Sequence, residues 1–137
     1  MFKLVVAYFM TAIVFLAIDY VWLSKVATRF YFDRIGHLLM DKPNMIAAGV
    51  FYIVYVVGIV IFAVAPALKN DSIATALIYG ALFGFFTYAT YDVTNYATLK
   101  NWPVIVAVVD VIWGTVLSAT SAVLGFLLTR LVTSGYQ

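Results

Sequence analysis

The polar side chains of this chain gather in residues 88–114, which read YATYDVTNYATLKNWPVIVAVVDVIWG. Two carboxylates, Asp92 and Asp110, and the amide of Asn95 lie there among apolar and aromatic residues. An isolated ion in an apolar medium costs several kcal/mol, so each carboxylate must either face a partner or be neutral. Acids inside long apolar helices usually mark a path for an ion or a substrate. Residues 88–114 are therefore the candidate functional site.

A third carboxylate, Asp19, lies near the end of the first apolar run. Thr11, Asp19 and Trp22 share one helical face, so this carboxylate points to the same side as the tryptophan. The same D-x-x-W arrangement occurs at Asp110 and Trp113. That pattern would fit internal repetition, although four positions often match by chance.

The composition places these acids in a membrane. Apolar residues make up 66% of the 137 residues and charged residues only 10%, which is too little polar surface for a soluble domain. A spanning helix needs about 20 residues, so four apolar runs use nearly the whole chain. We therefore expect an all-α fold, an integral membrane four-helix bundle that forms a single domain over residues 1–137. The net charge of +2 is small and scattered, which argues against nucleic acid as a partner.

The four spans are expected at about residues 4–24, 44–66, 72–98 and 103–130. Asn44 is a suitable cap for the second helix, and Pro66 followed by polar residues marks its end. Because the connections are short, the helices must alternate in direction. The loops after the first and third helices then lie on one side of the membrane, which we name side B.

Residues 25–43, KVATRFYFDRIGHLLMDKP, are basic and aromatic and connect the first two spans. Their pattern predicts a short interfacial helix or lid, with apolar side chains on the membrane and charged ones toward water. Arg29 and Arg34 are suited to contact lipid phosphates, and His37 lies close to them in the sequence. These three residues form the candidate site for a lipid head group.

Asp19, Asp92 and Asp110 come from three helices but reach one depth. Each lies six to eight residues from the lysine or proline that marks the side B end of its helix. At the helical rise this distance places the three carboxylates roughly 9 to 12 Å inside side B. Tyr52 and Tyr55 of the second helix reach a similar level, so every helix contributes to one polar layer. The acids lack the local spacing of a metal loop, and we assign no metal site and no cofactor.

Small residues share the helical faces that carry the acids. The third helix aligns Gly80, Gly84, Tyr88, Asp92 and Asn95, and the fourth aligns Asp110, Gly114, Ser118, Ser121 and Gly125. Glycine and serine at four-residue spacing let helices approach closely in lipid. These faces are also a suitable interface for a homodimer.

Basic residues favour one orientation in the membrane. Five of them belong to side B and three to the opposite side: Lys25, Arg29, Arg34, Lys42 and Lys100 against Lys3, Lys69 and Arg130. The positive-inside rule then places side B in the cytoplasm and both termini outside.

Several segments together resemble a bacterial family of small predicted membrane proteins, domain of unknown function 2177. They are DYVWL (residues 19–23), FYFDRIGHLL (30–39), FYIVYVVG (51–58), YATYDVTNYATLKNWP (88–103) and DVIWGT (110–115). The resemblance covers nearly the whole chain. It implies a multi-pass protein of the bacterial cytoplasmic (inner) membrane, with Asp92, Asn95, Asp110 and Trp113 as its polar signature. It implies no activity.

Three functional interpretations stay open. The leading one is binding or transport of a small cationic or proton-coupled solute at a buried site that comprises Asp19, Tyr88, Asp92, Asn95, Asp110 and Trp113. In it the acids bind the cation, Tyr88 and Asn95 donate hydrogen bonds, and Trp113 offers an aromatic face.

The second interpretation is a lipid-modifying membrane enzyme, in which paired carboxylates act as general acid and base. It predicts a groove that opens sideways to lipid and reaches the acids. The third is an accessory or scaffold subunit whose acids serve helix packing alone. The partners are therefore membrane lipids in every case, and a small solute in the first.

Overall fold

The computed structural model describes residues 1–134, which form helices and no strands. In chain order the elements are α1 (Phe2–Trp22), η1 (Leu23–Ala27), α2 (Thr28–Ile35), η2 (Gly36–Leu38), α3 (Met45–Ile59), η3 (Val60–Val64), α4 (Ala65–Asn70), α5 (Ile73–Thr98) and α6 (Val104–Thr133). They combine into four continuous helices that are long and apolar enough to cross a membrane: Phe2–Leu38, Met45–Asn70, Ile73–Thr98 and Val104–Thr133. The expected all-α membrane bundle with four spans is confirmed.

The first span continues beyond residue 24, where the sequence predicted its end. A π-helical turn, η1, connects α1 to α2, and the hydroxyl of Thr28 donates a hydrogen bond to the carbonyl oxygen of Leu23, five residues back. This contact spans the wider π-helical turn, and the chain stays helical through the basic segment. The short helix expected between the first two spans is thus α2, and it continues the first span.

The second span begins and bends where its sequence requires. The side chain of Asn44 accepts a hydrogen bond from the backbone N–H of Ala47 at 3.0 Å, which confirms the predicted cap. Pro66 lies in the first turn of α4, directly after the π-helical turn η3. Proline has no N–H for the carbonyl four residues earlier, so the helix widens at this point instead of ending. The span ends at Asn70, before Asp71 with φ of 51°.

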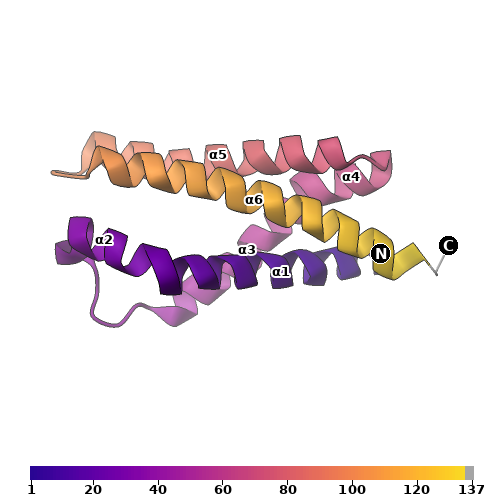
Figure 1. The fold of residues 1–137 in the computed structure, drawn as a ribbon, viewed down its shortest axis with the longest axis horizontal. Coiled ribbons are helices and arrows are strands. Elements are labelled where there is room, and N and C mark those ends of the chain that lie inside the picture. The colour runs from indigo at the N-terminus through magenta and orange to yellow at the C-terminus, as the bar shows by residue number, and fades with distance from the viewer. Residues whose placement is uncertain (135–137) are drawn as a thin grey trace.

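The helices alternate in direction, as the short connections predicted. Figure 1 shows the N-terminus and the end of α6 at one end of the bundle, and the turns after α2 and α5 at the other end, which is side B. We name the opposite end side A. The turn between α4 and α5 lies on side A, where the guanidinium of Arg130 binds the carboxylate of Asp71 at 2.7 Å.

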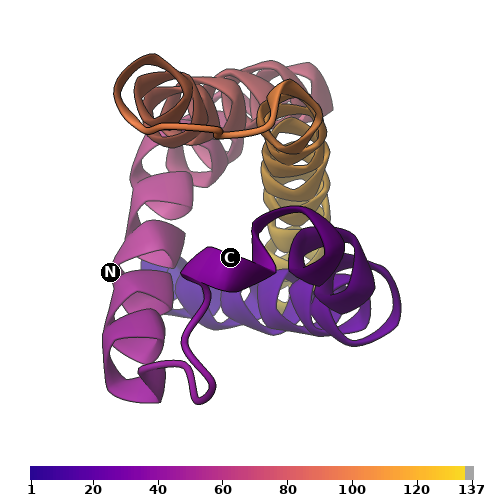
Figure 2. The same cartoon turned by 90° about the vertical axis from the view of Figure 1, so that its left-hand side faces the viewer.

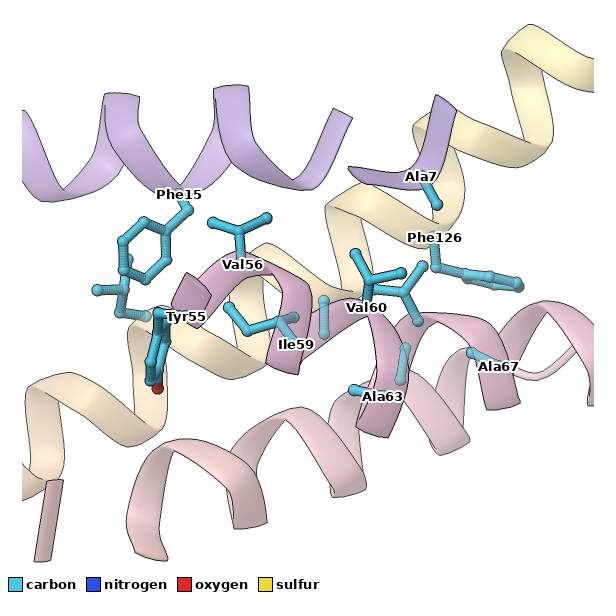
Figure 3. Packing of buried hydrophobic residues seen from close by; sticks show 13 residues of the cluster. Ala7, Phe15, Tyr55, Val56, Ile59, Val60, Ala63, Ala67 and Phe126 are labelled. Atoms are coloured by element: carbon cyan, nitrogen blue, oxygen red, sulfur yellow. The ribbon is translucent and has the colours of Figure 1, made fainter. Parts of the chain in front are cut away.

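The second span crosses the bundle. α3 contacts α1 near side B, whereas η3 and α4 contact α5 near side A. Seen from side B, the four spans surround a common centre (Figure 2). The buried apolar side chains of α1, α3, η3, α4 and α6 meet along this crossing, as Figure 3 shows for Phe15, Val56, Ile59 and Phe126.

The most extensive helix contact joins α5 to α6 through the small residues named above. A Cβ atom added to Gly80 would lie 2.8 Å from Cβ of Ala122, and one added to Gly84 would collide with the carbonyl group of Gly114. The glycine and serine faces are therefore occupied within one chain. A homodimer stays a prediction, and it would need another surface.

One buried hydroxyl group connects three helices at the middle of the core. The Tyr55 hydroxyl of α3 lies 2.6 Å from the Ser118 hydroxyl of α6 and 3.1 Å from the Thr87 hydroxyl of α5. Interhelical hydrogen bonds in membranes contribute about 0.6 kcal/mol each, so this contact fixes the helix register at a modest gain.

Candidate functional site

Asp19 lies in a complete hydrogen-bonded cluster. Its side chain is buried on α1, and the Tyr52 hydroxyl of α3 donates to Oδ2 at 2.7 Å. The Trp113 indole N–H of α6 donates to Oδ1 at 3.3 Å. Both carboxylate oxygens thus have donors, which is the condition for burying a charged group at low cost. The cluster ties α1, α3 and α6 together.

The two D-x-x-W segments meet in space. The rings of Trp22 and Trp113 stack with centroids 4.2 Å apart and an interplanar angle of 11°. One face of Trp113 is thereby covered by Trp22, and its N–H is directed at Asp19. The tryptophan expected to offer an aromatic face to a cation is therefore engaged on one face and at its polar edge.

Asp110 is held by a residue from the first span. The hydroxyl of Tyr31 on α2 donates to Oδ1 of Asp110 on α6. This contact exists because the first span continues as α2 and brings Tyr31 beside the start of α6. Phe30, Tyr31 and Ala107 also pack against a small apolar cluster of Ile35, Trp102 and Val106.

Asp92 differs from both other acids. Its side chain on α5 is 0% exposed, and neither of its oxygens has a hydrogen-bond partner. The Trp102 indole lies next to this carboxylate, yet its Nε1 also lacks a partner with acceptable hydrogen-bond geometry. A buried carboxylate whose nearest donor is poorly aligned is stabilised by a proton or by a bound cation.

Tyr88 on α5 is near both Asp19 and Asp92. Its ring covers Gly114, where an added Cβ atom would collide with the ring carbons, and it meets the ring of Tyr55 edge-on at 6.1 Å. It interacts electrostatically with both Asp19 and Asp92. A single tyrosine thus lies within electrostatic range of the paired acid and the unpaired acid.

Asn95 is half-buried one turn beyond Asp92, and its amide interacts with the hydroxyl of Tyr91. The Tyr91 ring in turn packs edge-on against Trp102 at 6.0 Å. Asn95, Tyr91 and Trp102 therefore lie on the side B flank of Asp92.

The candidate head-group residues lie on the surface at side B. Arg29, Arg34 and His37 are exposed on α2 and η2. The guanidinium of Arg34 lies 4.1 Å from the centre of the Phe30 ring and donates to the Phe30 carbonyl oxygen at 3.2 Å. This arrangement keeps the charge near the membrane surface, and head-group binding by the three residues stays a prediction.

The three carboxylates do not converge on one point. Within residues 1–134 there is no group of three histidine, aspartate or glutamate side chains that could hold a metal ion. Asp19, Asp92 and Asp110 occupy three adjoining positions with different partners. Two of the acids are hydrogen-bonded, and the third has no partner with good hydrogen-bond geometry.

Sequence reasoning missed two partners in this region. Tyr31 was part of the predicted lid, and only continuous helix through residues 23–27 reveals its contact with Asp110. Trp102 is not among the predicted site residues, although it is buried and adjoins Asp92. The signal available for Trp102 was its position in the short turn between the helices that carry Asp92 and Asp110.

The comparisons with other proteins identify the sequence family. A protein-family model described as "Predicted membrane protein (DUF2177)" matches residues 4–127. No curated protein and no solved structure matches the chain.

Proposed function

Since the chain belongs to the DUF2177 family of predicted membrane proteins, whose description names no activity, we propose its function from the site: it binds a small cationic or proton-coupled solute at Asp92. The observation that carries this proposal is the buried Asp92 carboxylate without a hydrogen-bond partner. Helices in lipid rarely keep such a group unless it binds an ion or a substrate.

The residues around Asp92 supply the other contacts that a cation needs. Asp92 provides the charge, and Tyr88 and Asn95 offer hydroxyl and amide groups. The aromatic rings of Tyr91 and Trp102 adjoin the carboxylate and can stabilise a cation through their faces. Small ammonium ions and protons therefore match the surroundings of Asp92 better than anions do.

The other two acids flank the proposed site. Asp110 is half-buried at the same depth as Asp92 and is held by Tyr31, so its carboxylate adds to the attraction for a cation that approaches Asp92. Asp19 is saturated by Tyr52 and Trp113 and keeps the helices in place. We therefore propose that the cation enters from side B. It binds at Asp92, where it replaces the proton of the carboxyl group.

The alternative functions have less support. Neither of two apolar grooves on the helix bundle is lined by an aspartate, whereas a lipid-modifying enzyme needs its acids at the lipid. A scaffold role would fit Asp19 and Asp110, which are both hydrogen-bonded, but it leaves Asp92 without a purpose.

Calorimetry on the purified full chain in detergent tests the proposal. Methylammonium, tetramethylammonium and sodium ions serve as probes, each titrated into the wild type and into Asp92→Asn. We expect at least one probe to bind the wild type and to lose affinity by about tenfold or more in Asp92→Asn, as one removed charge contact predicts. Asp19→Asn is the matched control and should keep the affinity within about threefold, because its carboxylate already has two donors. Equal affinities in the wild type and Asp92→Asn would refute the proposal.

A further inference from the structure

A second site is suggested by a groove on the lipid-facing surface near side A. The groove has a volume of about 680 Å³ and lies between η3–α4 and α5. Phe62, Phe83 and Phe86 form its walls, Asn70 lies at one end, and Thr87 lies at the other. It is almost wholly apolar and contains no residue of the Asp92 site.

The groove has the length of one membrane leaflet. Asn70 is the last residue of the second span, so the outer end lies at the side A surface. Thr87 follows Ile73, the first residue of α5, by fourteen positions, which is about 21 Å along a helix of roughly 39 Å. The inner end therefore lies near the middle of a bilayer whose hydrocarbon core is about 30 Å thick.

Local packing forms the groove in advance. A Cβ atom added to Gly58 would lie 2.5 Å from Cζ of Phe83, so only glycine lets this ring settle against the second span. The Phe83 ring then stacks on Phe62 with centroids 5.7 Å apart. Pro66 and the π-helical turn η3 bend the opposite wall. An apolar chain can thus enter without rearrangement of the helices.

The charges at the outer end favour an anionic occupant. Lys69 lies in the last turn of α4 and Asp71 directly follows that helix, and both are exposed. Arg130 already binds the Asp71 carboxylate at 2.7 Å, which leaves the Lys69 ammonium as the uncompensated charge beside the groove. A lysine near the membrane surface attracts anionic lipid by about fivefold.

We propose that this groove binds one anionic glycerophospholipid of the side A leaflet, with an acyl chain along Phe62, Phe83 and Phe86 and its phosphate at Lys69. This site is independent of cation binding at Asp92. The lipid would fill the groove between the second and third spans and add to the Phe62–Phe83 contact that already joins them.

Photocrosslinking tests the lipid site in the full chain. The protein is reconstituted in phosphatidylcholine nanodiscs that contain trace phosphatidylglycerol or phosphatidylcholine with the same diazirine-bearing acyl chain. Phosphatidylglycerol should label residues 61–62 and 82–87 about fivefold more than phosphatidylcholine does, because only its head group is anionic. Lys69→Gln should abolish this excess. Lys3→Gln removes a charge from the same membrane side on α1 and should leave the excess unchanged.

Other outcomes would overturn the proposal. Equal labelling of the groove by both lipids would show that no anionic lipid is selected. Labelling of outward residues of α1 such as Ile13 as strongly as the groove would show ordinary contact with bulk lipid. Absence of groove labelling by either lipid, while outward residues of α1 are labelled, would show that the groove is covered by something other than lipid. Leu82→Trp gives a further check, because its larger side chain should fill the groove and lower the labelling by phosphatidylglycerol.

Discussion

Asp19 and Asp92 are both buried aspartates at the side B half of the bundle, yet their surroundings differ completely. Asp19 receives a tyrosine hydroxyl and an indole N–H from two other helices. Asp92 receives neither, although Trp102 and Tyr88 lie close to it. The difference separates a carboxylate that the fold itself stabilises from one whose stability depends on a proton or a ligand.

The comparison also shows that tryptophan has two different roles in this part of the bundle. Trp113 donates its N–H to an acid and stacks on Trp22, so it behaves as part of the framework. Trp102 is buried beside an acid, but its N–H has no acceptor at good hydrogen-bond geometry. Because the indole N–H of Trp102 is not well used, a ligand bound between Trp102 and Asp92 can contact both side chains.

The largest effect is expected at Gly114, which contacts the Tyr88 ring near Asp19 and Asp92. Gly114→Ala places a methyl group against the Tyr88 ring, which lies between Asp19 and Asp92. Overpacking of this kind costs about 3 kcal/mol, and the ring must move away from both acids. Unfolding of the reconstituted protein by SDS titration should show this loss, together with weaker binding of the probe cations. A stable variant with normal binding would mean that Tyr88 does not connect the two regions.

Replacing each acid by leucine sharpens the contrast. Asp19→Leu leaves the Tyr52 hydroxyl and the Trp113 N–H without an acceptor and should lower the free energy of unfolding by about 2 kcal/mol. Asp92→Leu removes a carboxyl group without partners and should leave stability unchanged or raise it, by about 1 kcal/mol at most. The same SDS titration compares the two variants. Equal losses would remove the distinction between the paired and the unpaired acid.

The two tryptophans provide a matched pair of substitutions. Trp113→Phe and Trp102→Phe make the same change in side-chain volume, but only Trp113 loses a hydrogen bond and a stacked ring. Trp113→Phe should therefore cost about 1 kcal/mol more in stability than Trp102→Phe. Thermal unfolding followed by circular dichroism measures the difference between them. A larger loss in Trp102→Phe would show that its indole N–H is engaged after all.

The smallest effect concerns the third acid. Tyr31→Phe removes the donor to Asp110, which joins α2 to α6, and should cost about 0.6 kcal/mol, the usual value for an interhelical hydrogen bond in a membrane. Proteolysis of the reconstituted protein should then cut the segment after α2 faster, because α2 is less firmly attached. Unchanged proteolysis would mean that α2 is held by its apolar contacts with Trp102 and Val106 alone.

The fold was predictable because apolar run length determines it. Four long apolar stretches require four spans, and Asn44 and Ser72 cap the second and third as their side chains suggest. The end of the first span was not predictable from charge alone. Lysine and arginine after residue 24 suggest a loop, but they stay exposed on a continuous helix whose opposite face carries Tyr31 and Ile35.

The members of the site were predictable from helical depth, but their pairing was not. Asp19, Asp92 and Asp110 were expected at one level because each lies a similar number of residues from side B. Which acid obtains a donor depends on helix rotation and crossing, which decide that Tyr52 faces Asp19 and that no hydroxyl reaches Asp92. Such rotations arise from contacts like that of Gly84 with Gly114, and spacing along one helix does not reveal them.

Infrared difference spectroscopy of the carboxyl groups tests the central claim most directly. The carbonyl band of protonated Asp92 is assigned by its loss in Asp92→Asn and is followed against pH with and without methylammonium. We predict that this band titrates and that the cation removes it by displacing the proton, whereas Asp19, assigned with Asp19→Asn, does not respond to the cation. An Asp92 band that ignores both pH and every probe cation while the protein stays folded would identify a sealed packing group and contradict the account.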